Sequence, residues 1–210
     1  MWKIPVWLVG VTILVMAYAA WAEAPATQPS TQRATGDIKE SEAVRVNGLD
    51  FQIVAPVVWM MPVEKEETPI PLVLKVTNHT DKAVTLNLFD TITISMKDAA
   101  GKELRIDGGR DGTTPCPPLI VEKGQNGTVD RSAKLQPLDG KLGQFRLIGS
   151  DGAGGIWYFD GLKPGKYTIS MAYENTKAGP EDAPNWVGKA TTKELTVEIT
   201  DKSAASQPAR

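Results

Sequence analysis

Short segments in which apolar and polar residues alternate recur along this 210-residue chain, with turns rich in Gly, Asp and Pro between them. Residues 84–88, 92–96 and 167–173 show the pattern most clearly, because every second side chain in each is apolar. A period of two sends neighbouring side chains to opposite faces, so each segment predicts a half-buried β-strand. No window longer than about ten residues has the apolar spacing of a helix. The sequence therefore predicts an all-β fold.

Between residues 43 and 201 the pattern predicts one domain of about eight to ten short strands. Strands at regular intervals, with turn residues between them, are typical of a sandwich or a barrel. Asn47 and Gly48 are expected to form a bulge or turn within the first strand. The predicted strands cover residues 44–46 with 49–53, 72–76, 84–88, 92–96, 103–106, 118–122, 127–135, 143–149, 156–159, 167–173 and 195–199.

Residues 162–167 read Leu-Lys-Pro-Gly-Lys-Tyr and lead into the strand expected at 167–173. A Tyr that opens the penultimate strand directly after a Gly turn resembles the tyrosine corner of immunoglobulin-like sandwiches, in which the phenol hydroxyl bonds a backbone group across the corner. The resemblance implies an immunoglobulin-like antiparallel β-sandwich with residues 195–199 as its last strand. Because the chain has one Cys, the inter-sheet disulfide of antibody domains is excluded.

The N-terminus has the pattern of an export signal. Lys3 precedes an apolar run over residues 4–22 that ends Ala20-Trp21-Ala22, and these small residues fit cleavage after Ala22. The alternative is an uncleaved anchor, because a run of about 19 apolar residues can just span a bilayer. In both cases the rest of the chain is expected to be exported, to a periplasmic or extracellular compartment, and membrane contact is expected only through this segment if it is uncleaved.

Two polar segments are expected to flank the domain. Residues 23–42 consist largely of Ala, Pro, Thr, Gln, Ser and Glu and predict a disordered spacer, because they cannot bury enough apolar surface to offset the entropy of ordering. Residues 202–210 predict a short disordered tail. The intervening domain, residues 43–201, is long enough to bury roughly 70% of its unfolded surface without a disulfide.

Composition excludes several classes of function. One Cys and one His leave no Cys-rich zinc module. The net charge of −2 gives no electrostatic case for nucleic-acid binding. No set of paired catalytic residues stands out, so the sequence predicts no enzyme, no cofactor and no metal site. A protein partner is the expected ligand.

Several short motifs can be interpreted either as functional sites or as ordinary structural features. Ser150 with His79 as base would be a catalytic pair, but the surroundings are not those of a nucleophile elbow. Cys116 is interpreted as a half-buried bystander, since no neighbouring residue supplies positive charge.

The glycine-rich run at 149–155 lacks the following helix of a phosphate-binding loop and predicts a hairpin connection or a loop close to a partner. Turns rather than calcium ligands are expected at the five Asp-Gly pairs, which begin at Asp107, Asp111, Asp139, Asp151 and Asp160.

Aromatic side chains in loops are candidate anchors for a partner. Trp186 lies in the long connection over residues 174–189, at one end of the expected sandwich. It either projects toward a partner or folds back to cap the open end of the sandwich. The same two alternatives apply to the segment Trp59-Met60-Met61-Pro62.

The Gly-Ala-Gly-Gly run at 152–155 and the Asn-Trp-Val-Gly run at 185–188 resemble the last two loops of chagasin-type inhibitors of papain-like cysteine proteases. Those inhibitors are immunoglobulin-like sandwiches whose loops dock at the protease cleft. Asn185 stands where that family has Pro. The resemblance implies a protease inhibitor whose two loops lie side by side and exposed.

Residues 72–106 resemble, in their pattern of strands and turns, a bacterial proteinase-inhibitor domain of the intracellular type. In overall character the chain is similar to uncharacterised exported bacterial proteins with one immunoglobulin-like domain behind a Pro/Thr/Gln spacer. The resemblances to the two inhibitor families both imply a sandwich-like fold.

The function expected from the sequence is a non-enzymatic exported binding or scaffolding module. It would act through the end loops of the sandwich, at 149–156 and 174–189, or through an exposed strand edge. The alternative is a chagasin-like protease inhibitor that uses loops 152–155 and 184–188. The residues predicted to bind a partner are Gly154, Gly155, Trp157, Trp186 and Gly188.

Overall fold

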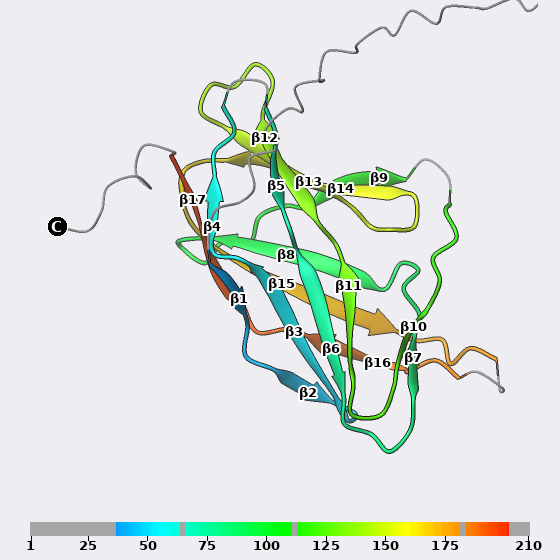
Figure 1. Ribbon diagram of the computed structural model, residues 1–210. Coiled ribbons are helices and arrows are strands. Elements are labelled where there is room, and N and C mark those ends of the chain that lie inside the picture. Colours follow the sequence, from blue (N-terminus) through cyan, green and yellow to red (C-terminus); the bar gives the residue numbers. More distant parts are fainter. Residues whose placement is uncertain (1–36, 64–65, 111–112, 181–183, 202–210) are drawn as a thin grey trace, which may run out of the picture. The chain divides into compact units, whose positions relative to one another are not determined.

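The computed structural model describes residues 37–63, 66–110, 113–180 and 184–201 (Figure 1). The expected signal segment over residues 1–22, most of the spacer and the tail over residues 202–210 lie outside the described residues. Within them the chain is all-β, with seventeen strand segments and no helix. No described segment could therefore cross a bilayer as a helix.

The strands form three five-stranded sheets and one strand pair. The first sheet has the order β1-β3-β6-β11, with β2 also paired to β3: β1 (Ile38–Glu40), β2 (Val44–Val46), β3 (Leu49–Pro56), β6 (Val73–Asn78) and β11 (Asn126–Asp130). The second has the order β16-β15-β17-β4, with β8 also paired to β15: β4 (Val58–Met60), β8 (Ile92–Asp98), β15 (Gly165–Asn175), β16 (Gly188–Thr191) and β17 (Leu195–Thr200).

The third sheet has the order β5-β12-β13-β14-β9: β5 (Thr68–Ile70), β9 (Asp107–Arg110), β12 (Ala133–Pro137), β13 (Phe145–Ser150) and β14 (Gly155–Leu162). The strand pair joins β7 (Val84–Leu86) to β10 (Leu119–Val121). Neighbouring strands run antiparallel except β4 and β17, which run parallel.

Alternation along the strands builds the core. On β3, Leu49, Phe51 and Ile53 are fully buried, while the residues between them are partly exposed. The Phe51 ring stacks on the Tyr173 ring of β15, with 6.0 Å between centroids. The first sheet therefore packs its apolar face on the second, which makes the fold a β-sandwich. Burying each such side chain contributes about 1.5–3 kcal/mol.

The third sheet joins the same core. Leu135 on β12, Leu147 on β13 and Phe159 on β14 share its inner face and are almost completely buried. They belong to one apolar cluster with the inner residues of the other sheets. The described residues from 37 to 201 thus have a single core.

Two predicted turns are confirmed in detail. Asn47 and Gly48 join β2 to β3 with φ angles of 46° and 80°, the positive values that a two-residue hairpin turn requires. At the other turn, the Tyr167 hydroxyl accepts a hydrogen bond from the Lys163 backbone N–H and donates one to the Lys163 carbonyl, both at 2.9 Å. This is the geometry expected of a tyrosine corner.

Three expected boundaries differ from the structure. Residues 103–106 do not form a strand: one isolated bridge joins Glu103 to Lys97, and the next strand is β9. The strand expected at 127–135 is two strands, β11 and β12, which leave Arg131 and Ser132 between them and belong to different sheets. The spacer was expected to reach residue 42, but β1 pairs with β3 from Ile38 onward.

The number of strand segments exceeds the eight to ten expected because several are only three or four residues long. β5 contains Pro69 and β9 contains two glycines, so neither shows the apolar alternation that predicts a strand.

The Asp-Gly pairs do not all form turns. Asp139 and Asp151 precede glycines with positive φ in turns, as expected. Asp107 lies inside β9, and Asp160 lies inside β14 next to a bulge at Gly161. The pair that begins at Asp111 lies outside the described residues.

Candidate protein-binding edge

Trp186 is a core residue, and the prediction that it is an exposed anchor is wrong. Its side chain is 9% exposed, and its ring lies 5.5 Å from that of Phe51 and 5.6 Å from that of Tyr173. Its backbone N–H donates to the Thr85 carbonyl at 2.7 Å, and its carbonyl accepts from the Asn175 side chain at 2.8 Å. Trp186 therefore folds back to cap the sandwich, the second alternative considered from the sequence.

Trp157 and Gly155 are also buried, so they cannot contact a partner as predicted. The indole of Trp157 covers Gly149, where a Cβ would lie 2.3 Å from the ring, and its Nε1 donates to the Ser150 carbonyl at 3.2 Å. The Asp151 carboxylate folds over Gly155 and accepts its backbone N–H at 2.8 Å. Trp157 and Gly155 thus contact residues 149–151 and hold the β13–β14 connection in place.

Gly154 and Gly188 remain at least partly accessible, but Gly154 lies in the β13–β14 connection of the third sheet and Gly188 in β16 of the second. Gly154 is exposed at the tip of the β13–β14 connection with a φ of 94°. Gly188 lies against Trp186, where a Cβ would come within 2.5 Å of the indole. Among the described residues, no hydrogen bond or ion pair joins loop 151–155 to segment 184–188. The five predicted residues thus do not form one binding surface.

The segment after β3 is likewise part of the core. Trp59 is fully buried and its Nε1 donates to the Pro56 carbonyl at 2.8 Å, and Met60 is 6% exposed. Of the two alternatives for this segment, packing is the one the structure shows.

Ser150 and His79 do not meet. His79 Nε2 lies 2.8 Å from Asp50, whose carboxylate is also bound by Arg45. The Arg45 hydrogen bond is the main reason that the pKa of Asp50 is lowered. The Ser150 hydroxyl, on β13, accepts the Gly152 N–H at 3.0 Å. In the part of the chain that the structure describes, no group of three or more His, Cys, Asp or Glu side chains is placed to hold a metal.

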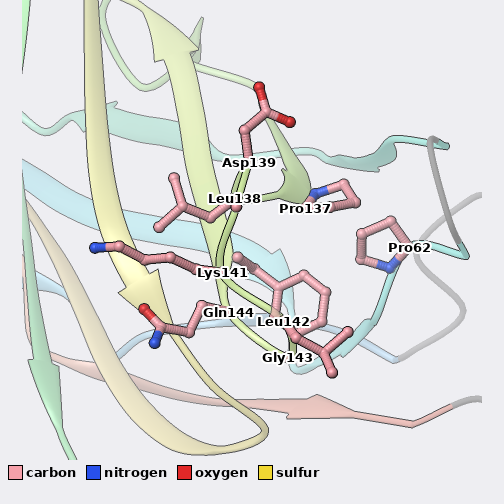
Figure 2. Close-up of a pocket in the computed structure, with 10 residues that line it drawn as sticks. Pro62, Pro137, Leu138, Asp139, Lys141, Leu142, Gly143 and Gln144 are labelled. Atoms are coloured by element: carbon pink, nitrogen blue, oxygen red, sulfur yellow. The ribbon is translucent and has the colours of Figure 1, made fainter.

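A hollow of about 580 Å³ lies at the β12–β13 hairpin (Figure 2). Leu142 at the hairpin tip is fully exposed, and Pro62, from a distant part of the chain, also lines the hollow. Figure 2 shows Asp139 and Lys141 pointing in different directions, so these two charged side chains do not converge on a ligand.

The surface that sequence reasoning missed is the outer edge of the third sheet. β9 is the last strand of that sheet, and in the described residues it pairs only with β14. All four of its residues are exposed. Nothing lies within 4 Å of the position that a Cβ of Gly109 would take, so no side chain covers its backbone there. An edge of this kind presents unpaired N–H and C=O groups to an incoming strand.

Apolar side chains flank this edge. Ile156 of β14 lies directly opposite Gly109 and is 50% exposed. Ile106, immediately before β9, and Phe89 are each 38% exposed. The Arg110 guanidinium lies 5.1 Å from the centre of the Phe89 ring, so Phe89 belongs to the same surface. We refer to β9 with Ile106, Ile156 and Phe89 as the β9 edge.

Ion pairs hold the β9 edge in place. Arg110 Nη2 lies 2.7 Å from Asp151 Oδ2 and 3.1 Å from Asp90 Oδ1. Burial alone raises the pKa of Asp151, but the Arg110 hydrogen bond and the backbone N–H groups of Ala153 and Gly155 outweigh it, so the pKa is lowered. The charged carboxylate therefore ties loop 151–155 to the end of β9.

Comparison with known proteins assigns no class: no protein-family model matches the chain, and no curated protein matches it. Any functional argument therefore depends on the geometry of the fold and of the β9 edge.

Proposed function

We propose that this protein is a non-enzymatic, exported binding module that takes up an extended segment of a protein partner along the β9 edge. The observation that supports it is the position of β9: an outermost strand, exposed at all four residues and unpaired on its outer side in the described residues. Strand addition at such an edge gives affinity through main-chain hydrogen bonds and specificity through alternate side chains of the added strand.

The side chains around β9 define the kind of segment that fits. An added strand would lie next to β9 and two strand spacings from Ile156, and because Gly109 has no side chain, a long apolar side chain of the added strand would reach across it toward Ile156. Four residues offer few main-chain bonds, so these apolar contacts must supply much of the affinity. Edge strands that avoid pairing often carry charged side chains or Pro; β9 has no Pro, and its two charged residues, Asp107 and Arg110, are engaged in ion pairs with neighbouring side chains.

A matched pair of variants tests the proposal. Ile156→Lys puts a charge on the β9 edge, and Ile120→Lys makes the same change at an isoleucine of β10 that is 59% exposed. Partners are captured from the exported fraction of the source organism with residues 23–210 of each form, and the captured protein is purified for calorimetry. We expect Ile156→Lys to weaken its binding at least tenfold and Ile120→Lys to leave it unchanged. Equal binding by the two variants would refute the β9 edge as the site.

Amide hydrogen exchange gives a second, independent readout. On partner binding, residues 107–110 are expected to gain protection, because their outer N–H groups become hydrogen-bonded. Protection confined to segment 184–188 would instead point to the end loop named from the sequence.

The alternative function, protease inhibition in the chagasin mode, has less support. It needs Trp186 exposed beside loop 152–155, and Trp186 is 9% exposed and packed on Phe51 and Tyr173. Titration of papain with the protein tests this alternative, and stoichiometric loss of papain activity would restore it.

Export and the subtype of the fold are part of the same proposal. Export rests on the apolar run over residues 4–22 and its small residues at Ala20 and Ala22. An immunoglobulin-like type of sandwich is supported by the Tyr167 corner that precedes the last strands. N-terminal sequencing of the secreted protein checks the first point.

A further inference from the structure

A buried arginine lies in the link between β11 and β12. Arg131 is 6% exposed, and its backbone N–H donates to the Leu72 carbonyl at 2.8 Å. Its Nη1 donates to the Asp130 carbonyl at 2.9 Å. Its Nε and Nη2 are buried and make no hydrogen bond to any described residue. Leaving charged donors unsatisfied is costly, so an anion that reached these two atoms would be bound.

The carboxylates nearest to Arg131 are already engaged. Asp151 accepts Arg110 on one oxygen and the backbone N–H groups of the β13–β14 loop on the other. Asp130 Oδ1 accepts the Ser132 N–H at 2.6 Å. Burial lowers the pKa of Arg131 more than the neighbouring Cys116, Asp151 and Asp130 raise it. Among the described residues, no carboxylate forms an ion pair with the guanidinium; the ion pair of Asp151 is with Arg110.

Burial lowers the pKa of Arg131, and the Cys116 thiol is the first of the groups that oppose this shift, so it neighbours the guanidinium. Cys116 is half-buried, and its segment is tied to the glycine-rich loop by a bond from the Thr114 N–H to the Ala153 carbonyl at 3.0 Å. The same loop covers the guanidinium at Gly152, where a Cβ would lie 2.9 Å from Arg131 Nη1. Arg131, directly after β11, is thus the positively charged neighbour of Cys116 that the sequence did not reveal.

We propose that Cys116 is an oxidative modification site whose sulfinate form is bound by Arg131 Nε and Nη2. Hydrogen peroxide is the oxidant. The thiolate sulfur attacks one peroxide oxygen, the O–O bond breaks, hydroxide leaves, and sulfur is oxidised by two electrons to the sulfenic acid. The sulfenate then attacks a second peroxide, which gives the sulfinate and water.

The two oxygens of a sulfinate match the two buried donors, Nε and Nη2. The Nε–Nη2 edge of an arginine is a planar fork that binds two oxygens of one anion in parallel. The sulfinate would give both buried N–H groups an acceptor and the guanidinium a counter-charge. Oxidation of Cys116 is therefore expected to stabilise the fold, whereas oxidation in an apolar core destabilises it. This inference does not depend on the proposed partner binding.

Peroxide treatment tests the chemistry. The purified chain is treated with hydrogen peroxide, digested, and mapped by mass spectrometry, so that methionine oxidation is distinguished from oxidation of Cys116. We expect a sulfinate on the Cys116 peptide and a melting temperature about 2–4 °C above that of the reduced protein. Arg131→Leu removes the donors without adding an oxidisable thioether and should abolish the rise. A Cys116 that stays unmodified, or an equal rise in Arg131→Leu, would overturn the proposal.

A second variant tests the binding of the anion without oxidation. Cys116→Asp places two carboxylate oxygens near the fork, and Cys116→Ser is its neutral control. The Asp variant should melt above the Ser variant in the wild-type background, and this difference should vanish with Arg131→Leu. If the Asp variant melts below the Ser variant in both backgrounds, Arg131 does not hold an anion at this position.

Discussion

The indole of Trp186 packs against the phenol ring of Tyr173, with 5.6 Å between ring centroids, at the end of the sandwich where the sequence predicted an exposed binding loop. The Tyr173 hydroxyl donates to the Asn87 carbonyl at 3.0 Å, and its burial raises the pKa of Tyr173 to about 12. The pair, with Phe51, closes this end of the core. The aromatic residue most suggestive of binding thus serves stability.

Truncation of Trp186 should therefore destabilise the protein. Trp186→Ala removes a buried indole from contact with Phe51 and Tyr173, and such losses cost about 3–5 kcal/mol. Val187→Ala, at a neighbouring side chain that is 43% exposed, should change stability by less than about 0.5 kcal/mol. Urea unfolding followed by tryptophan fluorescence measures both. A Trp186→Ala variant as stable as Val187→Ala would mean that the side chain is not in the core.

The regular part of the fold could be predicted because its signals are local. Asn47 and Gly48 specify the hairpin turn, and the alternation at residues 92–96 specifies β8, whatever the rest of the chain does. The burial of Trp186 has no local signal, because it depends on contacts with the rings of Phe51 and Tyr173, which lie on other strands. Sequence spacing alone does not tell a loop that folds inward from one that projects.

The β9 edge gave no sequence signal for a physical reason. Its residues, Asp-Gly-Gly-Arg, have no apolar alternation, and they form a strand only because β14 offers a partner. The proximity of Cys116 to Arg131 was also hidden. The expected strand at 127–135 continued through Arg131, whereas the chain changes sheets there and buries the guanidinium.

The hydroxyl of Tyr167 should contribute measurably to stability. Tyr167→Phe removes two hydrogen bonds to the backbone of Lys163 and leaves the ring in place. The expected loss is about 1–2 kcal/mol. Tyr158→Phe serves as control, because the Tyr158 ring lies 4.4 Å from the Arg146 guanidinium, a contact that the substitution keeps. Thermal unfolding compares the two, and equal effects would show that the corner adds nothing.

The Asp151 carboxylate should make stability depend on pH in the acid range. Because its pKa is lowered in the folded protein, the charged form stabilises the fold above the ordinary Asp pKa. That contribution is lost as the pH falls from about 4 through the lowered folded value. Asp151→Asn should thus cost about 1–3 kcal/mol at pH 7 and progressively less below pH ~4. Urea midpoints of both forms across this range provide the check, and a difference that is constant with pH would contradict it.

The two glycines of β9 should differ sharply when each is replaced by Ala. A Cβ at Gly108 would lie 2.3 Å from the Ile156 carbonyl oxygen, whereas a Cβ at Gly109 would meet nothing within 4 Å. Because a backbone carbonyl cannot move aside cheaply, Gly108→Ala should displace β9 from β14, at a cost of about 1–3 kcal/mol. Amide exchange within residues 107–110 should then accelerate, and partner binding at the β9 edge should be lost. Gly109→Ala should keep both the protection of the β9 amides and the binding of the partner. A Gly109→Ala variant that loses binding while β9 is still protected would show that the added methyl itself blocks the partner.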